Sequence, residues 1–134
     1  MIGVWSVIGY NMVLFISGLQ EIPGDYYEAA EIDGATGIRQ FFDVTIPLLS
    51  PTTFFIVQTR VIGALTIFDL MFMVMDNTNP ALQKVQSIVY VFYKYSFGQG
   101  NKGYGAALVM ILVVFIMLVT VIMQKAEKKF VFYN

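Results

Sequence analysis

The chain has 134 residues, of which 57% are hydrophobic and 13% are charged, and its formal net charge is -1. Soluble domains carry about 25% charged residues, so this composition excludes an ordinary soluble domain and indicates a membrane protein. The sequence contains no cysteine and no histidine, which excludes thiol chemistry and removes the common zinc ligands and the usual general base. We therefore expect no catalytic residue, no metal site and no cofactor. The weak net charge, without a basic stripe, argues against nucleic acid as a partner.

Three stretches of the sequence approach the length that a helix needs to cross a membrane, which is about 18 to 20 apolar residues. They are residues 2–19, 51–75 and 105–123. The first stretch has no basic residue before it and no small-x-small cleavage pattern after it, so we interpret it as a span rather than a secretory signal. The predicted fold is all-α: a multi-pass protein of the cell membrane with about three transmembrane helices in the lipid bilayer.

The segment between the first two spans, residues 20–50, is polar at its start and is not expected to lie in lipid. Pro23-Gly24-Asp25 is a turn signal, and Asp25 followed by Glu28 has the spacing of a capping box, with Asp25 as the N-cap of a helix. Gly34 and Gly37 are expected to interrupt this helix. The local pattern therefore predicts a helix that ends in a turn.

A second short helix is expected after this turn, over residues 38–44, before the prolines at the start of the second span. Ile38, Phe41, Phe42 and Thr45 recur at the three- and four-residue spacing that places side chains on one helix face. The loop as a whole is therefore predicted to be a helix-turn-helix with a short amphipathic second element.

The segment between the second and third spans, residues 76–103, begins with the turn-rich "DNTNP" and continues through "VQSIVYVFYKYSF". Its aromatic residues suit a helix at the level of the lipid headgroups, and a buried packing role is an equal alternative. The tail carries Lys125, Lys128 and Lys129 directly after the third span. The count of basic residues on each side does not settle orientation, but three spans place the first loop and the tail on the same side.

Residues 28–34 have the composition of a docking element. Ala29 and Ala30 allow close approach of a partner, Gly34 allows a sharp reversal, and Glu28 can offer a carboxylate to an arginine. A solvated connector with ordinary capping explains the same residues, and their chemistry alone leaves both interpretations open.

The spacing of these residues resembles a known signature. Glu28-Ala29-Ala30, three residues, Gly34, nine residues and then Val44-Thr45-Ile46-Pro47 is similar to the "EAA" motif of binding-protein-dependent ABC transporter permeases, with Val in place of Ile and Ile in place of Leu. The flanking "GLQEIPGDYYEAAEIDGA" and "FFDVTIPLLSP" resemble the carbohydrate-uptake branch, and "GYGAA" and "KKFVFY" look like the maltose and glycerol-phosphate type of subunit.

This resemblance implies that the loop and the tail are cytoplasmic and that the loop couples the chain to ATP-binding subunits. Glu28 would form a salt bridge with the ATPase, Ala29 and Ala30 would make the close contact, Gly34 would form the turn, and Pro47 would close the motif. The other implied partners are a second permease subunit, an extracytoplasmic solute-binding protein facing residues 76–103, and a carbohydrate substrate. No Gly-rich phosphate loop is present, so the chain itself is not expected to hydrolyse ATP.

Polar residues within a span are costly, so each is a candidate for a substrate pathway, and helix packing is an equal alternative for the small ones. Arg60 lies about 13 Å inside the start of the second span, near mid-membrane. Matching to the maltose-type permease places the family's sugar-contacting positions at Gly3, Ser6, Val7 and Tyr10 on the first span and at Arg60, Gly63, Ala64 and Ile67 on the second. Binding of an acidic or phosphorylated sugar by Arg60 and pairing of Arg60 with an acid of the partner permease both remain open.

The chain also departs from the family pattern. Such subunits usually have about six spans, so we expect this chain to be the C-terminal half of a permease subunit. Asn77-Thr78-Asn79-Pro80 stands where the family often has "TGGGP", which puts the conformation of the outer loop in doubt. An alternative from another class is a small membrane-anchored adaptor that recruits a soluble partner through its loop without transport.

Overall fold

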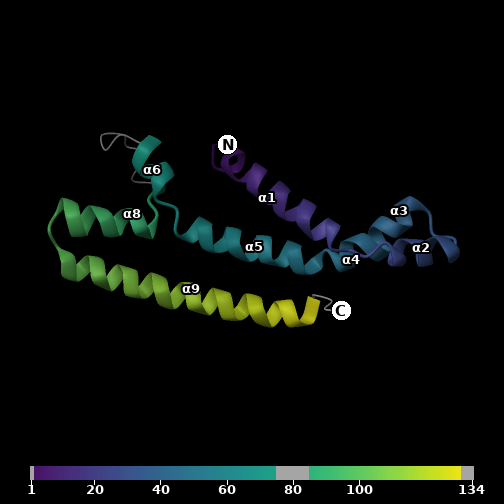
Figure 1. The fold of residues 1–134 in the computed structure, drawn as a ribbon. Helices are drawn as coiled ribbons and strands as arrows, with labels where there is room; N and C mark the ends of the chain where they lie inside the picture. The colour runs from purple at the N-terminus through teal and green to yellow at the C-terminus, as the bar shows by residue number, and fades with distance from the viewer. Residues whose placement is uncertain (1, 75–84, 131–134) are drawn as a thin grey trace. The chain divides into compact units, whose positions relative to one another are not determined.

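The computed structural model describes residues 2–74 and 85–130, and every regular element in these two ranges is a helix (Figure 1). The predicted all-α class is therefore confirmed. The chain divides into two compact units, residues 1–58 with 124–134 and residues 59–123. The predicted turn at Asn77-Thr78-Asn79-Pro80 lies outside the described residues, as do residue 75 and the end of the tail.

Two of the described helices are long and apolar enough to cross a membrane. Helix α1 (Ile2–Gln20) contains one such stretch, Gly3–Gln20, and helix α9 (Lys102–Phe130) contains the other, Lys102–Lys128. Each is uninterrupted, so the backbone hydrogen bonds of a crossing segment are satisfied within the helix. A third span is reached only if the bent pair Gly37–Leu48 and Ser50–Leu65, which meet at 58°, is counted as one.

The second predicted span, residues 51–75, is wrong as a single helix. Helix α5 (Ser50–Leu65) ends before Thr66, and a new helix, α6 (Asp69–Val74), begins after Phe68. The Thr66 hydroxyl donates to the carbonyl oxygens of Ile62 (3.0 Å) and Gly63 (3.4 Å). Such side-chain bonds to the preceding turn compete with the backbone ladder and bend or end helices. The apolar composition alone did not reveal this competition.

The predicted capping box at the start of the loop is also wrong. Helix α2 (Asp25–Ile32) has Gly24 at its N-cap position, and no side chain caps it. The N–H groups of Tyr27 and Glu28 both donate to the Gly24 carbonyl, at 2.9 and 3.1 Å, so the helix begins one residue earlier than predicted. Asp25 and Glu28 instead lie in the first turn, where a negative charge interacts favourably with the helix dipole.

Helix α2 ends in a Schellman motif centred on Gly34. The sequence predicted a turn at this glycine. Gly34 has a φ of 75°. Its N–H donates to the carbonyl of Glu31 (2.9 Å), and the N–H of Ala35 donates to the carbonyl of Ala30 (2.9 Å). This pair of bonds satisfies two of the carbonyl groups that a helix end leaves open. The chain then reverses into helix α3 (Gly37–Gln40).

The second part of the loop contains a π-helix that the sequence did not predict. Element η1 (Phe41–Thr45) follows α3 directly and leads into α4 (Ile46–Leu48). The N–H of Ile46 donates to the carbonyl of Phe41, five residues earlier. We attribute the wide turn to Pro47, which has no N–H and whose ring would clash with a carbonyl four residues before it in an α-helix. The Ser50 hydroxyl donates to the Pro47 carbonyl at 2.6 Å.

In the first unit, a small residue allows two helices to approach closely. Gly18 of α1 is buried against Thr52 of α5. A Cβ atom at Gly18 would lie 2.5 Å from Thr52 Oγ1 and 2.9 Å from Thr52 Cβ. Small residues at such crossings are typical of membrane helices, whose association depends on close packing rather than on the hydrophobic effect.

In the second unit, aromatic rings hold the segment after α5 against helix α8 (Ile88–Tyr93) and the π-helix η2 (Lys94–Gly98). We call five rings that are linked through Phe68 and Tyr93 the aromatic cluster: Phe68, Phe72, Tyr90, Tyr93 and Phe97, with the paired centroids 5.2 to 6.5 Å apart. The start of α9 lies beside η2 (Figure 1), where Gly105 contacts Ser96 and the rings of Tyr95 and Tyr104 meet at 4.7 Å. These contacts favour the packing role over the headgroup role for this aromatic segment.

Replacing Gly34 with alanine should destabilise the loop by about 1–2 kcal/mol, because a non-glycine residue at positive φ is strained. The space around its Cβ position is open, so the cost is conformational rather than a clash. Hydrogen exchange of the Ala35 amide, measured in detergent, should become faster in Gly34→Ala. Gly37→Ala is the matched control, since Gly37 also has open space and lacks a positive φ. Equal exchange in both variants would contradict this explanation.

Replacing Gly18 with alanine should weaken the contact between α1 and α5 by about 1–3 kcal/mol, because the added methyl group overpacks the crossing. Gly9→Ala on the same helix serves as the control, since nothing lies within 4 Å of its Cβ position. Thermal unfolding in detergent should show a lowered Tm for Gly18→Ala alone. Combining it with Thr52→Gly removes the clashing atoms and should recover part of the loss, and a failure to recover would argue against this contact.

Candidate functional site

The structure brings the predicted docking residues together on α2 and the turn that follows it. Glu28 and Ala29 are exposed on α2, Ala30 is half-buried on the same helix, and Gly34 forms the turn. Pro47 is separate from this group, half-buried in α4 beyond the π-helix. The carboxylate of Glu28 is thus accessible to a partner, and Ala29 leaves the neighbouring surface without a long side chain.

Large apolar side chains lie exposed next to this group. We call Ile32, Ile38, Phe41 and Phe42 the apolar loop surface, and their exposed fractions are 87%, 76%, 52% and 60%. The rings of Phe41 and Phe42 contact each other edge to face at 5.3 Å. Exposed apolar residues gathered in a polar segment are a mark of an interaction site. Sequence reasoning missed Ile32, although an apolar residue at the end of an acidic helix was a signal for it.

Thr45 does not share the exposed face on which the sequence placed it. It is 7% exposed, whereas Ile38, Phe41 and Phe42 are mostly exposed. The wide turn of η1 changes the angular spacing between Phe41 and Thr45, so the three- and four-residue rule of an α-helix no longer applies there. The Thr45 and Tyr27 hydroxyl groups share a hydrogen bond at 3.0 Å, which joins the end of η1 to α2.

The loop is strongly acidic, and its acids are accessible. Six of the nine carboxylates of the chain lie in residues 20–50, all of them exposed, against the single basic residue Arg39: these acids are Glu21, Asp25, Glu28, Glu31, Asp33 and Asp43. A partner for this surface should therefore present basic residues around an apolar groove.

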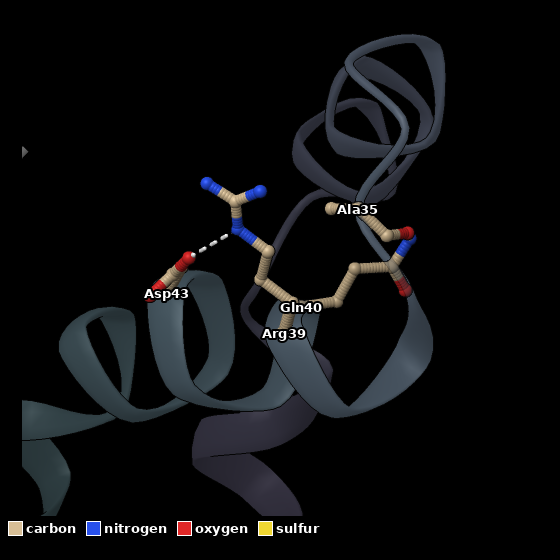
Figure 2. A network of polar contacts seen from close by, with 4 residues as sticks. All are labelled: Ala35, Arg39, Gln40 and Asp43. Atoms are coloured by element: carbon tan, nitrogen blue, oxygen red, sulfur yellow. Dashed lines mark hydrogen bonds and ion pairs between the residues drawn. The ribbon is translucent and has the colours of Figure 1, made fainter.

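Arg39 forms an ion pair within the loop. Figure 2 shows the Arg39 Nε group donating to Asp43 Oδ2, one helical turn away, at 3.1 Å. The two side chains are 69% and 62% exposed, so this ion pair adds little stability. Gln40, in the same view, donates from Nε2 to the Ala35 carbonyl at 3.4 Å.

The predicted substrate-pathway residues on the first span lie on α1. Ser6 and Tyr10 are both exposed, and the Ser6 hydroxyl donates to the Gly3 carbonyl at 3.0 Å, within the same helix. Next to Tyr10, the Oδ1 atom of Asn11 is buried and accepts no hydrogen bond from the described part of the chain. Asn11 is therefore a polar residue of this helix that the family positions did not include.

The predicted pathway residues on the second span lie in the other unit. Arg60 is half-buried on α5, and Gly63 and Ala64 are exposed one turn further along. Ile67 lies beyond the end of α5, in the interruption before α6. Ile67 therefore lies outside the helix that carries Arg60, and its place in the substrate pathway stays a prediction from the match to the family positions.

Comparison with known proteins gives a family and several relatives. Residues 1–131 match the family described as binding-protein-dependent transport system inner membrane component. The chain is 32% identical over 126 residues to the arabinooligosaccharides transport system permease protein AraP of Bacillus subtilis, a match that covers 94% of this chain and 40% of that protein. No solved structure is significantly similar to the chain.

Two further relatives come from Agrobacterium fabrum. The sn-glycerol-3-phosphate transport system permease protein UgpA is 37% identical over 131 residues, covering 97% of this chain and 44% of that protein. The sulfoquinovosyl glycerol transport system permease protein SmoG is 34% identical over 119 residues, covering 89% of this chain and 38% of that protein. The chain thus spans about two fifths of the length of these relatives.

The family match covers nearly the whole chain, including the loop and the helices α1 and α9 that are able to cross a membrane. Its members are membrane components of transport systems rather than enzymes, in agreement with the composition of this sequence. The chain belongs to the family of inner-membrane components of binding-protein-dependent transport systems.

Proposed function

We propose that this chain is part of the transmembrane permease subunit of an ABC importer for a carbohydrate or a related polyol. The observation that carries the proposal is the loop of residues 20–50: an E-A-A helix that ends at a left-handed glycine, next to exposed apolar side chains in an acidic surround. The matched relatives named for arabinooligosaccharides, sn-glycerol-3-phosphate and sulfoquinovosyl glycerol support the substrate class.

In this proposal the loop and the tail are cytoplasmic, and the loop docks on an ATP-binding subunit. Glu28 pairs with a basic residue of that subunit, and Ala29 and Ala30 allow the backbone of α2 to approach it closely. The apolar loop surface fills a groove on the partner, and removal of its apolar area from water favours binding. ATP-driven movement of the partner then displaces the helices attached to the loop.

The other components of the importer follow from the same proposal. A second permease subunit completes the pathway, and an extracytoplasmic solute-binding protein delivers the substrate to the side of residues 76–103. The substrate pathway includes Ser6 and Tyr10 on α1, Arg60, Gly63 and Ala64 on α5, and Ile67 just after α5. A guanidinium in this position suits vicinal hydroxyl groups or an anionic group on the solute.

Reversing the charge of Glu28 should abolish ATPase activity that is stimulated by the binding protein, because truncating or reversing a buried charge pair costs about 2–5 kcal/mol at an interface. The measurement is ATP hydrolysis by the complete transporter in proteoliposomes, with Glu28→Arg expected at least about tenfold below wild type. Glu21→Arg, at an exposed acid that precedes α2, shows how much of the loss comes from the overall charge of the loop rather than from Glu28 itself. Full stimulation in Glu28→Arg would favour the alternative of a membrane-anchored adaptor without transport.

Replacing Arg60 with glutamine separates its two possible roles. If Arg60 contacts the solute, Arg60→Gln should leave assembly with the second permease subunit intact and raise the solute concentration for half-maximal import by about tenfold, the typical effect of losing one charge-assisted hydrogen bond. Loss of the assembled complex on gel filtration would instead show that Arg60 pairs with the partner subunit. Import and assembly both at wild-type levels would remove Arg60 from the pathway.

A further inference from the structure

A hydrogen bond connects the docking helix α2 to the segment that leads into α5. The hydroxyl oxygens of Tyr27 on α2 and Thr45 at the end of η1 are 3.0 Å apart, although the two residues are 18 positions apart in sequence. Thr45 is buried and Tyr27 is half-buried, so this bond is partly shielded from water. A shielded hydrogen bond is stronger than an exposed one, and losing one of its partners leaves a buried polar group unsatisfied.

Thr45 is also joined to α5 through the backbone. Its carbonyl accepts the N–H of Leu49 at 2.9 Å, and the Leu49 carbonyl accepts both the N–H and the hydroxyl of Thr53, each at 3.0 Å. The hydrogen-bond ladder therefore continues from the end of η1 through α4 into the first turn of α5. A displacement of the Thr45 side chain acts directly on this ladder.

The same region of α5 is packed on α1. Thr52 lies against Gly18 so closely that a methyl group at Gly18 would not fit. A shift of the start of α5 towards α1 must therefore move α1 as well. Tyr27, Thr45 and Thr52 thus form a continuous set of contacts from the docking helix to two membrane helices within one compact unit.

Two other side-chain contacts of the loop, at Arg39 and at Gln40, do not make this connection. The ion pair of Arg39 and Asp43 is exposed and lies between residues four apart on adjoining turns. The bond from Gln40 to the Ala35 carbonyl is 3.4 Å long and joins residues five apart. Neither contact reaches α2, and the turn at Gly34 is held to α2 by backbone bonds at the C-terminal end of that helix.

We propose that Tyr27 and Thr45 are positioning residues that lock α2 to the start of α5, so that movement imposed on the docking helix is transmitted to α5 and α1. This inference rests on the proposed function, because it assumes that an ATPase moves the loop. Without the bond, α2 would stay docked on its partner but would turn about the Gly34 segment, and ATP would be hydrolysed with less solute carried across.

The test measures solute imported per ATP hydrolysed by the complete transporter, reconstituted in proteoliposomes with its binding protein. The variants are Tyr27→Phe and Thr45→Val, which each remove one hydroxyl group, together with the double variant. Thr45→Ser keeps the hydroxyl group and is the conservative rescue. Thr36→Val is the matched control, since the exposed Thr36 side chain makes no capping bond at the start of α3.

We expect both single variants to lower the ratio of import to hydrolysis by about fivefold, the effect of losing one buried hydrogen bond. The double variant should be no worse than either single variant, because both remove the same bond. Thr45→Ser and Thr36→Val should keep the wild-type ratio. Because the quantity is a ratio per assembled complex, a lower yield of a variant does not change it.

An unchanged ratio in Tyr27→Phe and Thr45→Val would overturn the inference. A double variant whose loss in the ratio equals the product of the two single losses would also overturn it. So would a loss in Thr45→Ser equal to that in Thr45→Val. Failure of the proposed function has a different signature: the wild-type complex would show no ATP-driven import, which would overturn both proposals. Import by the wild type together with unaffected variants would overturn only the role of this hydrogen bond.

Discussion

A backbone that crosses hydrocarbon has to satisfy its hydrogen bonds within the protein, and the arrangement of this chain follows from that requirement. In α1 and α9 an unbroken helix meets it. Where the helix is interrupted, side-chain hydroxyl groups and a wider turn supply the hydrogen bonds. The Thr66 hydroxyl bonds to carbonyls at the end of α5, and the turn of η1 precedes a proline that cannot donate. The irregular positions are therefore as constrained as the helices around them.

Burial contributes less to this structure than close local contact does. Among the described residues, the buried apolar side chains are Ile56, Tyr90 and Leu112, and most large apolar side chains of α1 and α9 are exposed. Such surfaces are compatible with lipid, where apolar burial between helices gives no net hydrophobic gain. Among the described residues, the contacts between segments include glycine against a small polar residue, aromatic rings against one another in the aromatic cluster, and the hydrogen bond between Tyr27 and Thr45.

The loop of residues 20–50 is both firmly folded and rich in exposed apolar side chains, two properties that are rarely found together on a surface without a partner. It is rigidly folded, through the Schellman motif at Gly34 and the bond between Tyr27 and Thr45. It also exposes large apolar side chains among carboxylates that no neighbouring cation neutralises apart from Arg39 at Asp43, within the described part of the chain. A surface that is preorganised in this way loses little conformational entropy when a partner covers it, which favours binding.

The sequence by itself determined the membrane class, the all-α fold, the helices α1 and α9, and the turn at Gly34. Each of these depends on composition or on residues that are neighbours in the chain, since an apolar run specifies a span and glycine tolerates a positive φ. The spacing of Glu28, Ala29, Ala30 and Gly34 likewise placed these residues together on one helix and its terminal turn, because they lie within two helical turns of one another.

Only the tertiary structure decided the remaining features. Whether Asp25 caps α2 or lies within it, and where α5 ends, depend on which of several competing hydrogen bonds forms in each turn. The burial of Thr45 depends on Tyr27, 18 residues away, and on the wide turn of η1, so no local periodicity could place it. Contacts between segments distant in the chain are set by packing, and a pattern of neighbouring residues carries no information about them.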